Sequence, residues 1–145
     1  MHLTLRPATP DDREFFARLH ERCYREVVTA QFGAWDPALQ ATLLARKWDP
    51  ARFAIVLLDG RAVGSLAVDR HPDHCFLADV MVDPSVQGRG VGTELVRRVI
   101  AEAAAAGLPV RLQVLHRNRA RALYERLGFT ATGETETHVR MERRN

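Results

Sequence analysis

A glycine-rich stretch, Gln87-Gly88-Arg89-Gly90-Val91-Gly92, joins an apolar run at residues 76–82 to a helical pattern that begins at Thr93. Three glycines within five positions leave a row of backbone N–H groups uncovered where a strand meets a helix. The helix dipole adds roughly half a positive charge at that end. We expect the junction to bind an anion, typically a phosphate, although a tight turn that only needs positive φ is the simpler alternative.

Two features favour the anion site over the simple turn. Gln87 and Arg89 alternate with the glycines and supply hydrogen-bond donors, and the stretch contains no Asn-Gly or Asp-Gly hairpin signal. The spacing fits neither the Walker loop nor the G-x-G-x-x-G dinucleotide fingerprint. The sequence therefore predicts a phosphate-binding loop of a third kind.

Composition excludes several classes of protein. A chain of 145 residues is predicted to form one domain, residues 1–145, and its 46% hydrophobic and 27% charged content is typical of a soluble protein. A net charge of +3 without a long basic run argues against nucleic-acid binding, and no apolar segment is long enough for a membrane. Cys23 and Cys75 lack disulfide or metal-site spacing, so we expect reduced thiols, no metal and a cytoplasmic location.

Hydrophobic periodicity and turn residues predict the element order βααβββαβαβ(β), which is one mixed α/β layer. Asp59-Gly60 is a hairpin signal, and Gly107 with Pro109 ends the helix after the glycine loop. The expected strands are residues 2–6, 53–58, 62–69, 76–82, 110–115 and 130–141, the last as a strand or a hairpin. The expected helices start near Pro10, Pro37, Thr93 and Asn118.

The stretch from Val82 to Gly92 also has the pattern Q/R-x-x-G-x-G/A after a strand and a Val-x-Pro-like segment. Asn118, Tyr124 and Gly128-Phe129 follow it in order. With these two motifs the chain resembles the GCN5-related N-acetyltransferases, or GNAT family. The resemblance implies a single-domain GNAT fold, with a mixed and mostly antiparallel central sheet flanked by helices, and acetyl-CoA as the cofactor.

The same resemblance assigns the cofactor-binding residues. The loop would bind the diphosphate, and the edge of the preceding strand would pair with the pantetheine arm where it splays from residues 110–115. Asn118 is either a helix cap or a cofactor contact, and the two roles are compatible. The implied set is Val80, Met81, Val82, Gln87, Gly88, Arg89, Gly90, Val91, Gly92, Thr93, Asn118 and Tyr124.

Tyr124 matches the general acid of the family. A phenol of ordinary pKa near 10 is suited to protonate a thiolate leaving group. Its position after Leu123 on a helix with an inward face also fits a core aromatic, and the spacing from Asn118 favours the catalytic role.

The general base is open between several groups. Asp79 lies on the strand beside the expected thioester position and could act directly or through water. Glu134, Glu136 and His138 alternate, so on one final strand they would share a face. His138 has an ordinary pKa suited to accept a proton near neutrality, whereas a purely structural histidine or a chain of water molecules would leave no base in this position.

The amine acceptor is expected against the first two helices and their connection. Tyr24, Phe32, Trp35 and Asp36 could form a cage for a cationic amine, with Asp79 and His138 completing the pocket. Alternatively, Phe32 or Trp35 only fills the joint between the helices.

The leading hypothesis is an acetyl-CoA-dependent N-acetyltransferase that acts on a primary amine of a small molecule or a protein in a ternary complex. A non-catalytic acyl-CoA-binding or sensing domain is the alternative, and a phosphate binder without a Walker lysine is disfavoured. We expect no nucleic-acid or membrane partner, and a monomer or homodimer.

Overall fold

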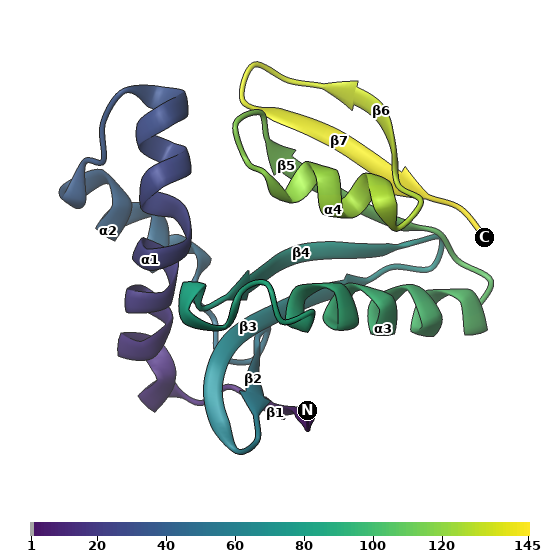
Figure 1. Ribbon diagram of the computed structural model, residues 1–145, viewed down its shortest axis with the longest axis horizontal. Helices are drawn as coiled ribbons and strands as arrows, with labels where there is room; N and C mark the ends of the chain where they lie inside the picture. Colours follow the sequence, from purple (N-terminus) through teal and green to yellow (C-terminus); the bar gives the residue numbers. More distant parts are fainter. Residues whose placement is uncertain (1) are drawn as a thin grey trace.

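The computed structural model describes residues 2–145, and its seven strands form one open sheet in the order β1-β2-β3-β4-β5-β7-β6 (Figure 1). Only the β4–β5 pair is parallel. The strands and helices are β1 (Leu3–Pro7), η1 (Pro10–Asp12), α1 (Arg13–Phe32), α2 (Pro37–Lys47), β2 (Ala54–Leu58), β3 (Arg61–Arg70), β4 (Cys75–Val82), η2 (Pro84–Val86), α3 (Val91–Ala105), β5 (Val110–Leu115), α4 (Ala120–Arg126), β6 (Thr130–Glu134) and β7 (His138–Arg143). The predicted α/β class and element order are confirmed.

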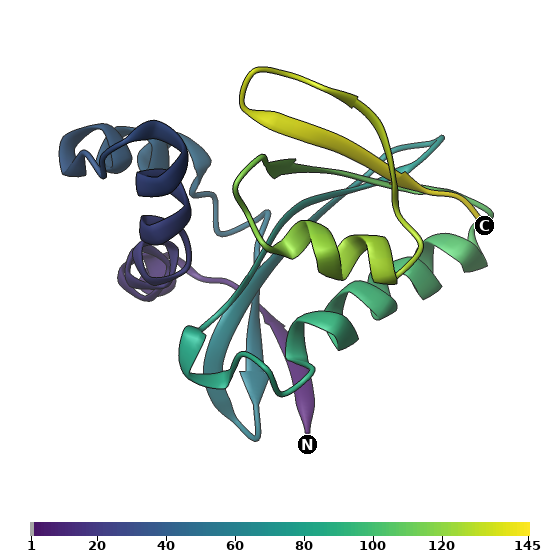
Figure 2. The same cartoon turned by 45° about the horizontal axis from the view of Figure 1, so that its top comes forward.

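Helices cover the two faces of the sheet with separate apolar cores. On one face, α3 and α4 lie over the strands (Figure 2). Buried residues such as Leu95, Val99 and Tyr124 belong to the core on this face. On the other face, α1 contributes Phe16 and Leu19. Helix α2 has no fully buried residue, so its apolar side chains are only partly covered by the protein.

Strand β4 leaves its parallel partner after three register positions. Its pairing with β5 covers only Cys75–Leu77, whereas β5 stays paired with β7 as far as Leu115. The two strands therefore diverge toward α1, as Figure 1 shows. The predicted splay between residues 79–82 and residues 110–115 is present.

A β-bulge at Ala78 accounts for this divergence. Across the β3–β4 pair, Leu77 and Asp79 face consecutive residues of β3, which leaves Ala78 as the extra residue. A bulge bends a strand and reverses the side to which its later side chains point. Leu77 accordingly packs in the α3 core, Met81 packs in the α1 core, and Asp79 shares the face of Met81.

The end of the chain is a hairpin, which is one of the two forms expected, but it overturns the expected common face of three side chains. Glu134 ends β6, Glu136 lies in the turn, and His138 begins β7. The three side chains therefore do not alternate along one strand, and both glutamates are exposed. His138 alone is brought next to β5, opposite Leu115.

Candidate active site

The glycine loop has the geometry expected of an anion site. Gly88 and Gly90 have φ values of 81° and 83°, and a Cβ added to either would meet no atom within 4 Å. Helix α3 begins at Val91 directly after Gly90, so the N–H groups of its first turn have no partner within the helix. The predicted strand–loop–helix junction is present.

This loop forms one wall of a cavity of about 960 Å³, here called the loop cavity. The opposite wall comes from α4 and the segment before it, and includes Arg117, Arg119 and Arg126. Gln87, Gly88 and residues 90–93 line it, whereas Arg89 does not. The cavity thus combines unpaired helix N–H groups with arginines, as a polyphosphate requires.

The exposed edge of β4 runs into the loop cavity. The Asp83 N–H donates to the Val63 carbonyl at 2.7 Å, so by antiparallel alternation the backbone groups of Met81 also face β3. Those of Val80 and Val82 face the splay. The Val82 carbonyl already accepts from Cys23 Sγ at 3.2 Å and Gln87 Nε2 at 3.0 Å, which leaves the backbone groups of Val80 and the N–H of Val82 facing the splay.

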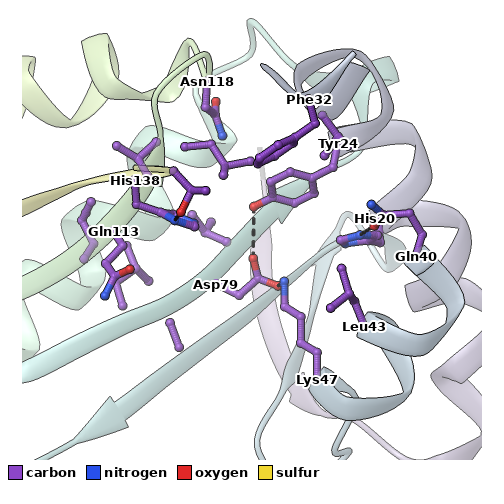
Figure 3. Close-up of a pocket in the computed structure, with 18 of the residues that line it drawn as sticks. His20, Tyr24, Phe32, Gln40, Leu43, Lys47, Asp79, Gln113, Asn118 and His138 are labelled. Atoms are coloured by element: carbon purple, nitrogen blue, oxygen red, sulfur yellow. Dashed lines mark hydrogen bonds and ion pairs between the residues drawn. The ribbon is translucent and has the colours of Figure 1, made fainter. Parts of the chain in front are cut away.

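A second cavity of about 670 Å³, the helix cavity, lies between α1, α2, β4, β5 and the start of β7 (Figure 3). Its wall shares four residues with the loop cavity: Tyr24, Val80, Asn118 and Tyr124. The two cavities therefore adjoin at these residues.

Tyr124 lies at this junction with an unengaged hydroxyl. The side chain is buried, its ring packs edge-on against Phe129, and its hydroxyl has no hydrogen bond within residues 2–145. Burial, with the negative charge of Asp79, raises the pKa of Tyr124. The phenol is therefore protonated at neutral pH and free to donate.

The position of Asn118 is compatible with both roles left open by the sequence. Its side-chain oxygen accepts from the Ala120 N–H at 2.9 Å, and the helix itself starts at Ala120, two residues later than expected. The residue also lines both cavities.

Asp79 is held by two partners on the floor of the helix cavity. Lys47 Nζ lies 2.9 Å from Oδ2, and the Tyr24 hydroxyl donates to Oδ1 over 3.3 Å (Figure 3). Burial and the charge of Asp79 raise the pKa of Tyr24, so this hydroxyl also stays protonated. Lys47 is the only lysine of the chain and was missed in the sequence, although it lies one helical turn after Leu43 on the same side of α2.

Two imidazoles also line the helix cavity. Burial and the proximity of His116 lower the pKa of His138, whose Nδ1 lies 2.7 Å from Thr137 Oγ1. Burial and the charge of Lys47 lower the pKa of His20, which contacts Gln40 over 3.3 Å. Both rings are neutral at neutral pH and can accept a proton. His20 was not predicted as a site residue, because nothing in the sequence distinguishes it beyond its helical spacing in α1.

The expected aromatic cage is formed only in part. Phe32 and Asp36 line the helix cavity, but Trp35 does not, and its ring packs against that of His20 at a centroid distance of 5.9 Å. The Asp36 carboxylate caps α2 by accepting from the Ala38 and Leu39 N–H groups. A carboxylate used as a cap is less available to an amine, which leaves Asp79 as the main acidic group of the cavity.

Neither cysteine has the environment of a reactive nucleophile. Burial raises the pKa of Cys23 to about 12, and Cys75 is buried in the α3 core. Within residues 2–145, no cluster of His, Cys, Asp and Glu could hold a metal ion. No helix of that part of the chain is long and apolar enough to cross a membrane.

Comparison with known proteins gives a consistent result. The chain is 35% identical over 133 residues to a mycothiol acetyltransferase from Thermomonospora curvata, covering 88% of this chain and 44% of that protein. It is 29% identical to an uncharacterized N-acetyltransferase from Methanocaldococcus jannaschii, covering 97% of this chain and 66% of the relative. The chain therefore spans less than two thirds of these curated relatives.

Solved structures share the fold at low sequence identity. The PaiA N-acetyltransferase from Thermoplasma acidophilum, solved in complex with coenzyme A, superposes with a TM-score of 0.81 at 14% identity over the whole of both chains. The ribosomal-protein-S18-alanine N-acetyltransferase from Escherichia coli gives 0.69 at 20% identity, covering 98% of this chain and 93% of that one. The model of the acetyltransferase (GNAT) family matches residues 13–129, and the chain belongs to that family.

Proposed function

We propose that this protein transfers an acetyl group from acetyl-CoA to a primary amine by direct transfer within a ternary complex. The observation that carries the proposal is the junction of the two cavities at Tyr124. The loop cavity suits a polyphosphate, and the helix cavity has an acid–base lining. A donor and an acceptor bound in these cavities would meet beside an unengaged phenol, which provides the proximity that acyl transfer needs.

The residues around the loop cavity fit coenzyme A. We propose that the N–H groups at the start of α3 bind the diphosphate, with Arg117, Arg119 and Arg126 near the remaining phosphate. The pantetheine amides would pair with the open backbone groups of Val80. The empty space at the Cβ position of Gly90 supports this arrangement, because phosphate oxygens can approach the backbone there.

The chemistry assigned to the chain is then short. The amine nitrogen bonds to the thioester carbon as the carbon–sulfur bond breaks. Tyr124 gives its proton to the departing thiolate, and the burial that raises the pKa of the phenol raises that of the thiolate as well. We propose that His138, directly or through water, accepts the proton of the amine, while Asp79 positions the amine.

Direct transfer is favoured over an acetylated enzyme intermediate. Cys23 is the thiol nearest to the donor path, and its raised pKa keeps it protonated at neutral pH. We also propose that residues 1–145 act as one domain in the cytoplasm, an environment that suits two free thiols.

The test is release of free thiol from acetyl-CoA in the presence of a panel of amines, including amino acids, polyamines and peptides with free N-termini. Turnover with one class of amine supports the proposal. Binding of CoA without turnover of any amine would instead favour a non-catalytic acyl-CoA-binding domain.

We expect His138 to set the acidic limb of the pH profile. The pKa of His138 is lowered from the ordinary 6.5 of histidine, so the imidazole is neutral and can act as a base at any pH above this lowered pKa. Activity should fall as the pH drops through the lowered pKa, because the ring becomes protonated. His138→Gln should lower kcat by about ten- to a hundredfold and remove this limb.

His116→Gln provides the matched comparison. It removes the neighbouring group that helps to lower the pKa of His138, so the acidic limb should move to higher pH while kcat at neutral pH changes little. Profiles measured with saturating acetyl-CoA distinguish the cases. Identical profiles for both variants and the wild type would assign the proton to water.

A further inference from the structure

The floor of the helix cavity carries one positive and one negative side chain in direct contact. The Asp79 side chain is only 3% exposed, whereas Lys47 is 31% exposed and reaches it from α2 at 2.9 Å. Apart from this ion pair, the buried Oδ2 atom accepts no hydrogen bond within residues 2–145. Because Oδ2 is buried and Oδ1 accepts from the Tyr24 hydroxyl, a ligand ammonium can reach this carboxylate only by taking the place of Lys47 Nζ.

This pair is a poor receptor for an ammonium ion alone. An amine that displaced Lys47 from Asp79 would leave the lysine charge without its partner, and removing one partner of a pair with a buried member is costly. A ligand that carries an ammonium and a carboxylate side by side can instead provide a new partner for each charge of the pair. Its ammonium contacts Asp79, its carboxylate contacts Lys47, and each charge keeps a counterion.

No other group of the cavity wall competes for a carboxylate or an ammonium as strongly. Lys47 is the only lysine or arginine among the lining residues. His20 and His138 have lowered pKa values and are neutral. The Asp36 carboxylate is engaged in capping α2.

The rest of the wall is apolar and open to solvent. Phe32, Leu39 and Leu43 are 54%, 52% and 43% exposed, and all three line the helix cavity. Only one other large hydrophobic side chain in the described part of the chain is comparably exposed, Leu5 on β1. Apolar side chains gathered at a cavity mouth are typical of a ligand-binding site, and a volume of about 670 Å³ suits a small molecule.

We infer that the acceptor is a small zwitterion of the α-amino-acid type with an apolar side chain. Lys47 binds its carboxylate, Asp79 orients its ammonium before deprotonation, and Phe32, Leu39 and Leu43 cover the apolar side chain. This inference rests on the proposed function and assigns the substrate class of its acceptor site.

Binding to the protein saturated with CoA tests the inference without turnover. The probes are leucine and phenylalanine, each compared by calorimetry with its carboxamide and with the amine that lacks the carboxylate. We expect the amino acids to bind at least about tenfold more tightly than both analogues, since a charge-assisted hydrogen bond contributes that much. Alanine, with a smaller apolar group, should bind more weakly than leucine.

Lys47→Met should remove this preference for the carboxylate, and binding of the simple amines should improve because Asp79 loses its counterion. Arg46→Met, which removes a neighbouring positive charge of α2 that does not line the cavity, should keep the preference. Melting temperatures identify any variant that is unfolded.

Three results would overturn the inference. In the first, the wild type binds the amines or amides as tightly as the amino acids, or more tightly. In the second, Lys47→Met keeps the preference for the carboxylate. In the third, neither amino acid binds. Thiol release, measured separately, reports on the proposed function. Amino-acid binding without thiol release would contradict the proposed acetyl transfer but support the inferred ligand class. Turnover of simple amines or peptides alone would support acetyl transfer and contradict the inferred ligand class.

Discussion

Tyr124→Phe is expected to lower kcat by about ten- to a thousandfold while the affinity for acetyl-CoA stays nearly unchanged. The hydroxyl has no hydrogen bond within residues 2–145, so its removal breaks no contact of the fold, and the ring still packs against Phe129. A proton donor acts mainly in the transition state. Its loss therefore affects kcat more than ground-state binding.

Tyr24→Phe is the matched comparison, because Tyr24 and Tyr124 are the only tyrosines and both line the two cavities. The Tyr24 hydroxyl is engaged with Asp79, so its loss should raise the KM of the acceptor more than it lowers kcat. Steady-state kinetics and calorimetry with acetyl-CoA separate the two outcomes. A Tyr124→Phe enzyme with wild-type kcat, or a larger loss of kcat in Tyr24→Phe, would remove Tyr124 as the acid.

The fold could be predicted because its signals are local. The glycines of residues 88–92, the Asp59-Gly60 turn and the apolar periodicity of α3 each determine nearby backbone, and the structure has all three. The position of the glycine loop before a helix could likewise be predicted, since an exposed helix N-terminus depends only on the residues of the loop itself.

The chemistry of the helix cavity could not be predicted in the same way. The side to which Asp79 points depends on the bulge at Ala78, and no turn residue in the sequence marks that bulge. Lys47 meets Asp79 across 32 positions of the chain, a contact that depends on how α2 packs. Trp35 is the kind of residue that often binds a cationic amine, yet in the structure it packs against His20 and does not line the cavity.

The expectation that Glu134, Glu136 and His138 share one strand face was wrong for a similar reason. Glu134, Glu136 and His138 alternate perfectly, but the turn at residues 135–137 interrupts the strand they would need. Thr135 holds that turn through its backbone N–H and side chain, both of which contact His138. Only His138 remained a candidate, since pairing with β5 brings it to the cavity.

Gly90→Val is expected to weaken CoA binding by about a hundredfold, which corresponds to the loss of one or two charge-assisted hydrogen bonds. At Gly90 an added Cβ meets no protein atom within 4 Å, so the valine methyl groups would extend into the space in front of the α3 N-terminus. That space is where phosphate oxygens would approach the N–H groups. The φ of 83° adds backbone strain in any residue other than glycine.

Gly107→Val separates the strain from the loss of the site. Gly107 has a φ of 71°, its Cβ position is equally open, and it follows the other end of α3, away from both cavities. Both variants should therefore melt at lower temperature, but only Gly90→Val should lose CoA in calorimetry. If both variants bind CoA with similar affinity, the diphosphate does not contact this loop. In that case the valine side chain at Gly90 would have no more effect on CoA binding than the one at Gly107.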